Sequence, residues 1–230
     1  MLKIAWSEEY HHPLPENHRF PMEKYSLIPE QLKYEGLVHE INFFKPGLLN
    51  EQLALRIHDK AYFEKLKNNK LSRAEERKTG FPLSHKLFTR ELIITQGTVD
   101  CSDFALKNGL AFNVAGGTHH AYRDRGEGFC LLNDIAISSQ YLIDNDLAKK
   151  ILVVDLDVHQ GNGTAKIFEN EKSVFTFSMH GERNYPMKKE KSDLDIELKD
   201  GIQDDEYLNK LRGSLDVIIG KFSPDFLFFQ

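Results

Sequence analysis

Three side chains of the metal-ligand type lie close together near the middle of the sequence. Asp155, Asp157 and His159 alternate with apolar residues directly after the apolar run 151–154. Because side chains two residues apart on a strand point to the same side, the pattern predicts all three on one face where a buried strand ends. A carboxylate and an imidazole together favour zinc or a similar transition metal over magnesium or calcium. The alternative is that the aspartates are ordinary turn or helix-capping residues.

The residues around these three predict how the strand continues into a helix. The alternation places Leu156 and Val158 on the opposite, packed side of the strand. Gly161 and Gly163 then permit a tight turn into a helix. In parallel α/β sheets, ligands bind outside the carboxyl ends of the strands, which is where this stretch, Ile151 to Gly163, ends.

A pair of adjacent histidines forms a second candidate group. His119 and His120 follow the predicted strand Leu110–Val114 and a double glycine. On a tight loop both rings can converge on one site, and neutral imidazoles are the usual general bases near neutral pH. The alternative is that both are surface loop residues. The histidine-rich stretch Glu8–Phe20 lacks regular metal-ligand spacing and is interpreted as a surface loop.

Composition excludes several classes of protein. The chain has 230 residues and a formal net charge of −5, so it lacks the basic surface that direct nucleic-acid binding needs. Only two cysteines, Cys101 and Cys130, occur, which favours a reducing compartment: the cytoplasm, or the nucleus if the source is eukaryotic. No apolar run reaches membrane-spanning length, and the N-terminus turns polar too quickly for a signal peptide. The oligomeric state is left open.

The order of elements predicts one α/β domain, 1–230, with a parallel sheet covered by helices on both faces. We expect strands at Leu2–Trp6, Ile41–Phe44, Leu110–Val114, from Ile151, at Val174–Met179 and at Phe226–Phe229. We expect helices at Met22–Tyr34, after caps at Asn50 and Asp59, at Ser72–Thr79, at Ser84–Lys107 with an interruption at Gly97, and at Asn133–Asp144, Gly163–Phe168 and Asp204–Lys221.

The motifs GGTHHA, GFCLLND and VVDLDVHQGNGT occur in that order, and together they resemble the zinc-dependent histone deacetylases and their acetoin-utilisation and acetylpolyamine amidohydrolase relatives. The resemblance covers nearly the whole chain, including IHDKAYFEKL, FTFSMHGERNYP and SDLDIELKDG. HQGNG, RNYP and DLDIEL are most similar to the bacterial and class IV branch. The resemblance implies a three-layer parallel sheet of the arginase/deacetylase type.

The resemblance also implies roles for matching residues. Asp157 and His159 would bind one zinc ion. His119 and His120 would be the paired histidines beside the water that attacks the substrate. Asp155 would accept a hydrogen bond from His119 and orient its ring.

Further matching positions concern the second histidine and the substrate. Asn162 stands where many family members carry an aspartate that pairs with the second histidine, so His120 would lack a neighbouring anion and be harder to protonate. Phe129 and Tyr185 would form the walls of a narrow apolar tunnel for an acyl-lysine-like chain. The Gly128 carbonyl would accept the amide proton of the substrate.

Two structural potassium sites are implied as well. The first would use backbone carbonyls around the three metal-ligand-type residues together with two residues of the next strand: Asp155, Asp157, His159, Ser178 and Met179. The second would use carbonyls near Phe168, Glu171 and Val174.

The implied function is a zinc-dependent hydrolase that removes acyl groups from protein lysine side chains or from small acylated amines. The third zinc ligand of the family, an aspartate, follows the strand that matches 226–230, and its transition-state tyrosine lies further on. We therefore expect a chain truncated at its C-terminus, and the alternative function is a remnant that binds a metal or a partner without turnover. An arginase-type hydrolase is disfavoured, because a dimanganese site needs more carboxylates.

Overall fold

Every strand pair in the structure is parallel. The computed structural model describes all residues, 1–230, and the chain forms two compact units, Met1–Tyr141 and Leu142–Gln230. The first unit contains a three-stranded sheet in the order β2-β1-β3, and the second contains a four-stranded sheet in the order β6-β5-β4-β7. Parallel strands joined by helical crossovers confirm the predicted α/β class. That the two units belong to one domain remains a prediction.

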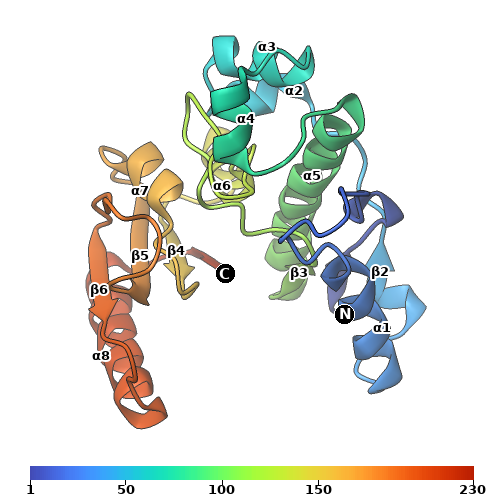
Figure 1. Cartoon of the computed structure of the whole chain (residues 1–230). Coiled ribbons are helices and arrows are strands. Elements are labelled where there is room, and N and C mark those ends of the chain that lie inside the picture. Colours follow the sequence, from blue (N-terminus) through green and yellow to red (C-terminus); the bar gives the residue numbers. More distant parts are fainter. The chain divides into compact units, whose positions relative to one another are not determined.

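The first unit is built around one long helix beside its small sheet. Helix α5 contacts β1, β3 and α3, and Figure 1 shows it as the long green helix. Its strands are β1 (Lys3–Ala5), β2 (Phe43–Phe44) and β3 (Ala111–Asn113). Its helices are η1 (Glu8–Tyr10), α1 (Lys24–Tyr34), η2 (Glu40–Asn42), α2 (Glu51–Ala54), α3 (Lys60–Lys67), α4 (Arg73–Thr79) and α5 (His85–Asn108). Helix α6 (Asp134–Asp144) begins in this unit.

Helix α5 is continuous, so the predicted interruption at Gly97 is wrong. A glycine weakens a helix by only about 1 kcal/mol, which packing can offset. Here the glycine serves close packing: a Cβ at position 97 would meet the Tyr10 hydroxyl, Asn113 Nδ2 at 3.0 Å and Ala5 Cβ at 3.2 Å. The absence of a side chain therefore lets α5 lie directly against β1, β3 and η1.

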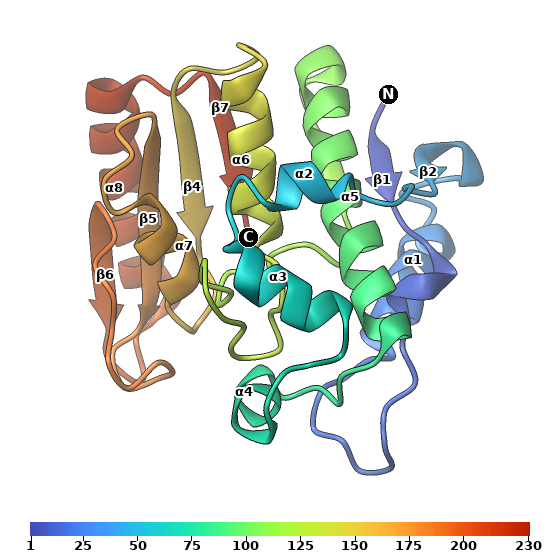
Figure 2. The same cartoon turned by 90° about the horizontal axis from the view of Figure 1, so that it is seen from above.

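The second unit contains the predicted central strand. Figure 2 shows its strands running side by side, with α8 alongside them. The strands are β4 (Ile151–Asp155), β5 (Val174–Gly181), β6 (Leu194–Leu198) and β7 (Phe226–Phe229). The helices are α7 (Asn162–Phe168) and α8 (Asp204–Phe222). Strand β6 was not predicted, although its alternating sequence LDIEL is typical of a half-buried strand.

The two faces of this sheet bury different residues. Leu152 and Val154 of β4 pack with Phe177 and Met179 of β5 against apolar residues of α8 such as Ile218. Helix α7 contacts β5 without joining that cluster. All five residues of β4 are buried, as the unbroken apolar run predicts.

No helix of the structure is long and apolar enough to cross a membrane. Both cysteines, Cys101 and Cys130, are free and buried.

Candidate functional site

The strand β4 ends at Asp155, earlier than the alternation predicts. Asp155 is buried, with 3% of its surface exposed, whereas Asp157 and His159 lie in the loop between β4 and α7. The placement of all three on one strand face is therefore wrong, and so is the packing of Val158, which is 52% exposed. Leu156 does pack against the α8 side of the sheet. The chain leaves the sheet here because side-chain oxygens of Asp155 and Asp157 accept hydrogen bonds from backbone N–H groups of the loop itself.

Asp157 and His159 nevertheless lie side by side. Oδ1 of Asp157 accepts a hydrogen bond from the backbone N–H of His159 at 2.7 Å and lies 3.0 Å from His159 Nδ1. In a tetrahedral zinc site with ordinary bond lengths, two atoms that bind the ion are separated by roughly 3.3 Å. The two atoms are thus of the right kind and nearly the right spacing to share one zinc, and both side chains are almost half exposed.

Asp155 is fixed by the loop and by Gln230, the residue that follows strand β7. Its Oδ1 accepts a hydrogen bond from the backbone N–H of Asp157 at 3.1 Å. Its Oδ2 accepts one from Gln230 Nε2 at 2.7 Å. Asp155 also pairs in register with Ser178 of β5, whose hydroxyl bonds His180 Nδ1 at 2.9 Å. The carboxylate is therefore held in one orientation at the end of the sheet.

Gln160 holds the loop after His159. This buried side chain donates to the Glu190 carbonyl and to Asp195 Oδ1, both at 2.8 Å, and accepts from the Glu190 backbone N–H at 2.8 Å. The backbone N–H of Gln160 also bonds the Tyr185 carbonyl at 3.3 Å. As a result the Tyr185 ring lies edge-on to the His159 ring, with centroids 6.3 Å apart.

Helix α7 begins directly at the buried Asn162, close to the predicted start. Neither Gly161 nor Gly163 adopts a positive φ, so the turn does not need the left-handed freedom of glycine that the sequence suggested. The carbonyls of Phe168 and Glu171 lie in the following turn, where they accept the N–H groups of Glu171 and Val174. Met179, on the next strand, is buried.

In the first unit, His119 and His120 are buried side by side. Their exposed fractions are 6% and 5%, and their ring centroids lie 4.1 Å apart with a 40° angle between the planes. The interpretation of these residues as surface loop residues is therefore wrong. Two adjoining imidazoles on a tight loop form a pair that can hold and pass a proton.

The loop before the histidines is tied to Asp134, the first residue of α6. This fully buried carboxylate accepts four hydrogen bonds: from the Thr98 hydroxyl at 2.6 Å, the Gly117 N–H at 3.1 Å, the Thr118 N–H at 2.8 Å and the Thr118 hydroxyl at 2.6 Å. A Cβ at Gly116 would approach the same carboxylate to 2.9 Å. Asp134 therefore fixes the path of the chain into His119.

The loop after the histidines is tied to His58, which sequence reasoning had not assigned a role. His58 Nδ1 lies 2.9 Å from the Tyr122 carbonyl, and Nε2 lies 3.0 Å from the backbone N–H of Asn133. Nδ1 must donate to the carbonyl while Nε2 accepts from the N–H, so the ring is neutral. Burial lowers the pKa of His58 from 6.5 to about 4. The only signal in the sequence is the position of His58 in the motif IHDKAYFEKL.

The lowered pKa of His58 predicts acid sensitivity. An unfolded chain binds a proton at this residue near pH 6.5, whereas the folded chain binds it only near pH 4, so unfolding becomes easier as pH falls between these values. The expected loss in the free energy of unfolding is about 3 kcal/mol. Urea unfolding at a series of pH values should show this slope, and the slope should be shallower in His58→Gln than in the exposed control His85→Gln. Equal slopes in both variants would contradict the assignment.

The Gly128–Phe129 segment is bonded to the end of α4. The backbone N–H groups of Gly128 and Phe129 donate to the carbonyls of Lys78 and Thr79 at 3.0 and 2.7 Å. Both residues have positive φ values, 55° and 67°, a strained conformation for phenylalanine. A Cβ at Gly128 would lie 2.6 Å from the His120 ring, so the absence of a side chain brings this backbone against the histidine pair.

The end of α4 is itself well defined. Ser72 and Glu75 form the predicted capping box, and the helix ends at Gly80 in the left-handed conformation, as the sequence predicts. The carbonyls that hold Gly128 and Phe129 thus come from a helix with both ends capped.

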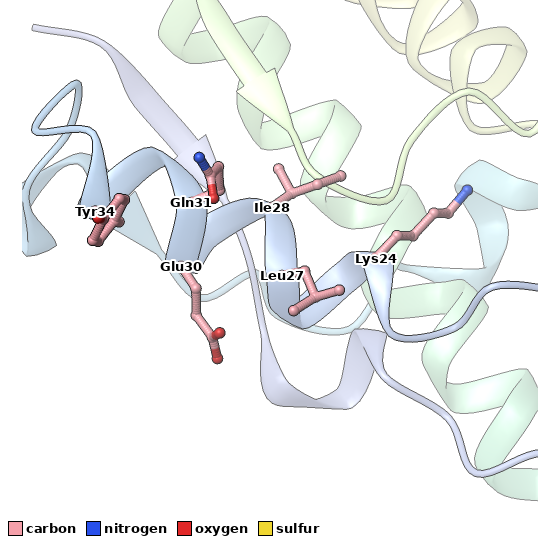
Figure 3. Close-up of a pocket in the computed structure, with 6 residues that line it drawn as sticks. All are labelled: Lys24, Leu27, Ile28, Glu30, Gln31 and Tyr34. Carbon is pink, nitrogen blue, oxygen red and sulfur yellow. The ribbon is translucent and has the colours of Figure 1, made fainter.

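An open hollow of about 700 Å³ lies elsewhere, along α1 (Figure 3). The side chains that line it all belong to this one helix: Lys24, Leu27, Ile28, Glu30, Gln31 and Tyr34. It contains none of the predicted site residues, so the hollow is not the candidate site. No group of three or more His, Cys, Asp or Glu side chains is placed to hold a metal ion.

The chain is similar to a known protein family and to several of its members. Residues 18–230 match the model of the histone deacetylase domain. An uncharacterised protein of Picosynechococcus sp. is 40% identical over 227 residues, covering 99% of this chain and 76% of that protein. Histone deacetylase 2 of Arabidopsis thaliana is 26% identical, covering 93% and 57%, and acetoin utilization protein AcuC of Staphylococcus aureus is 26% identical, covering 92% and 60%. The chain thus spans less than two thirds of the last two relatives.

Two solved structures of histone deacetylase homologs are similar to the whole chain. A histone deacetylase homolog from Aquifex aeolicus superposes with a TM-score of 0.84 at 26% identity, covering 100% of this chain and 68% of that one. A structure of a histone deacetylase homolog complexed with SAHA superposes with a TM-score of 0.86 at 27% identity and the same coverage.

Proposed function

The chain belongs to the histone deacetylase family, and from this premise we propose that it is a zinc-dependent amide hydrolase that removes acyl groups from lysine side chains or related amines. The observation that carries the proposal is the 3.0 Å separation of Asp157 Oδ1 and His159 Nδ1, a spacing at which both atoms can bind one metal ion. The similar histone deacetylase homolog that is complexed with SAHA supports a ligand-binding site in proteins of this fold.

Asp157 and His159 are the proposed zinc ligands. When bound, zinc supplies Lewis acidity, which polarises an amide carbonyl and makes water a stronger acid. Asp157 contributes a negative charge and His159 a neutral imidazole. Asp155, fixed by its own hydrogen bonds, is the proposed acceptor that sets the ring orientation of His119.

His120 is the proposed general base and His119 its partner. His120 takes the proton of the attacking water, and an acid delivers a proton to the leaving amine. Asn162 is proposed to take the position beside His120 where many family members carry an aspartate, so this position carries a neutral amide in place of a negative charge. The burial and close approach of the two rings support this assignment.

Phe129 and Tyr185 are the proposed walls for the acyl-lysine chain, and the Gly128 carbonyl is the proposed acceptor for the amide proton of the substrate. The packing of Gly128 against the His120 ring and of Tyr185 beside His159 supports these roles. Substrates would be acyl-lysine proteins or small acylated amines. The free cysteines support a reducing compartment such as the cytoplasm.

Potassium is the proposed structural ion around the carbonyls near Asp155, Asp157 and His159, together with Ser178 and Met179. Carbonyl oxygens are hard ligands and suit such a cation. Replacing potassium by sodium is expected to lower the melting temperature of the second unit, as followed by thermal unfolding in buffers of equal ionic strength. An unchanged melting temperature would remove the potassium assignment.

An assay with acetyl-lysine peptides and acetylated diamines tests the function. The zinc-loaded protein is expected to release acetate, and His120→Ala is expected to lower turnover at least a hundredfold. His39→Ala, at the exposed histidine that precedes η2, serves as the control. No acetate from any substrate, with one zinc bound, would contradict the hydrolase and favour a metal-binding protein without turnover. Normal turnover by His120→Ala would remove the histidine mechanism alone.

A further inference from the structure

The ring of Phe129 is surrounded by side chains from two distant segments of the first unit. Its centroid lies 5.0 Å from that of Phe20 and 5.2 Å from that of Phe81. His18 lies edge-on at 6.0 Å. The guanidinium carbon of Arg19 lies over the ring, 5.0 Å from its centroid. The N-terminal loop therefore covers part of the residue that we propose as a substrate wall.

The residues on either side of Arg19 are anchored. His18 Nε2 lies 2.8 Å from the Gly80 carbonyl, and His18 Nδ1 accepts the backbone N–H of Phe20 at 3.2 Å. His18 also stacks on Phe81, with centroids 5.8 Å apart, and Phe20 meets Phe81 edge-on at 5.0 Å. Arg19 is thus presented by a fixed segment, which lowers the entropy cost of using it in binding.

Gly80 allows this arrangement. A Cβ at position 80 would lie 2.6 Å from Cε1 of Phe129, and the residue has a φ of 80°. Only glycine gives this combination of close approach and left-handed backbone without strain. The Phe129 ring, the end of α4 and the loop 18–20 therefore form one packed assembly.

Arg19 is exposed, and no carboxylate of the chain pairs with it. Other arginines of this unit are used internally: Arg90 pairs with the adjacent buried Glu91, and Arg125 pairs with Asp124 and Glu127. A guanidinium that lies over an aromatic ring keeps the N–H groups along its edge available. These groups match a carboxylate, which can accept two parallel hydrogen bonds.

We propose that Arg19 determines specificity by binding a carboxylate of the substrate. The inference rests on the proposed function, in which Phe129 contacts the acyl-lysine chain, because a ligand on that ring comes within a few ångströms of the guanidinium. The carboxylate could belong to an acidic residue beside the acyl-lysine or to the end of a dicarboxylic acyl group. The chemistry is the same in both cases, and different substrates separate the two sources.

The experiment compares matched peptides with the zinc-loaded protein. One pair carries acetyl-lysine flanked by Glu or by Gln, and a third peptide carries succinyl-lysine flanked by Gln. Peptide binding is followed by fluorescence anisotropy and turnover by kcat/KM. We expect a carboxylate-bearing peptide to be preferred about three- to tenfold, through KM and the dissociation constant rather than kcat, and the preference to weaken with added salt.

Arg19→Gln is expected to abolish the preference, and Arg19→Lys to restore part of it because the charge returns without the planar fork. Arg212→Gln, at an exposed arginine of α8, should retain the preference. Equal binding of all three peptides by the wild type, or a preference that survives in Arg19→Gln, would overturn the inference. Failure of the proposed function looks different, since no peptide would then be hydrolysed, whatever its charge.

Discussion

Replacing Asp157 with alanine is expected to abolish zinc binding by the purified protein. The change removes one of the two proposed zinc-binding atoms that lie 3.0 Å apart, so that His159 is the one remaining proposed ligand on this exposed loop. Loss of a residue that merely supports a metal ligand costs 10- to 100-fold in affinity or activity, so loss of a ligand should cost more than about a hundredfold. Zinc content by elemental analysis and turnover of an acetyl-lysine peptide measure the effect.

The control for this change is Asp216→Ala, at an exposed aspartate of α8. It should leave both zinc content and turnover unchanged. Circular dichroism should show that Asp157→Ala folds, because this side chain lies almost half exposed on a loop of the second unit. A folded Asp157→Ala protein that retains one zinc per chain would show that the ion is held elsewhere.

Replacing Asp134 with alanine is expected to destabilise the first unit by about 3 to 5 kcal/mol. The buried carboxylate accepts four hydrogen bonds, and its removal takes this acceptor from the Thr98 hydroxyl and from the backbone N–H groups of Gly117 and Thr118 in the interior, whereas the Thr118 hydroxyl still has the Leu132 carbonyl. The loop that leads into His119 loses its fixed path, so turnover should fall together with stability. Urea unfolding and the acetyl-lysine assay report the two effects.

A milder variant keeps the Asp134 prediction testable if the alanine variant does not fold. Thr98→Val removes one of the hydrogen-bond donors to Asp134 and keeps a similar side-chain volume. We expect it to lower the free energy of unfolding by about 1 kcal/mol. Asp59→Ala is the matched control, because this exposed aspartate precedes α3 without a side-chain hydrogen bond. A loss of stability in Asp59→Ala as large as that in Asp134→Ala would show that the buried network is not the cause.

The fold could be predicted from the sequence where period and burial agree. The apolar run from Ile151 specifies a strand buried on both faces, and the helix of the second unit that begins at Asp204 shows apolar residues at helical spacing. Local chemistry also sufficed for the capping box at Ser72 and the stop at Gly80, since each depends on a few neighbouring residues.

Other features depend on long-range contacts, which periodicity does not report. The alternation 155–159 is typical of a strand, but these residues form a loop in which the aspartate side chains accept hydrogen bonds from backbone N–H groups. Gly97 is a residue type that often interrupts a helix, but here it lies in a continuous helix where β1 and β3 approach closely and leave no room for a side chain. Asp134 and His58 each join segments many residues apart, so neither a motif nor spacing could indicate their partners.

The tie made by His58 has a consequence for comparing related sequences. Both of its hydrogen bonds end on backbone atoms, the Tyr122 carbonyl and the Asn133 N–H. As far as this tie is concerned, side chains at positions 122 and 133 can change freely, whereas position 58 needs a ring that donates at one end and accepts at the other. A search for pairs of positions that change together would therefore not reveal these two hydrogen bonds, although they fix the loop of the histidine pair.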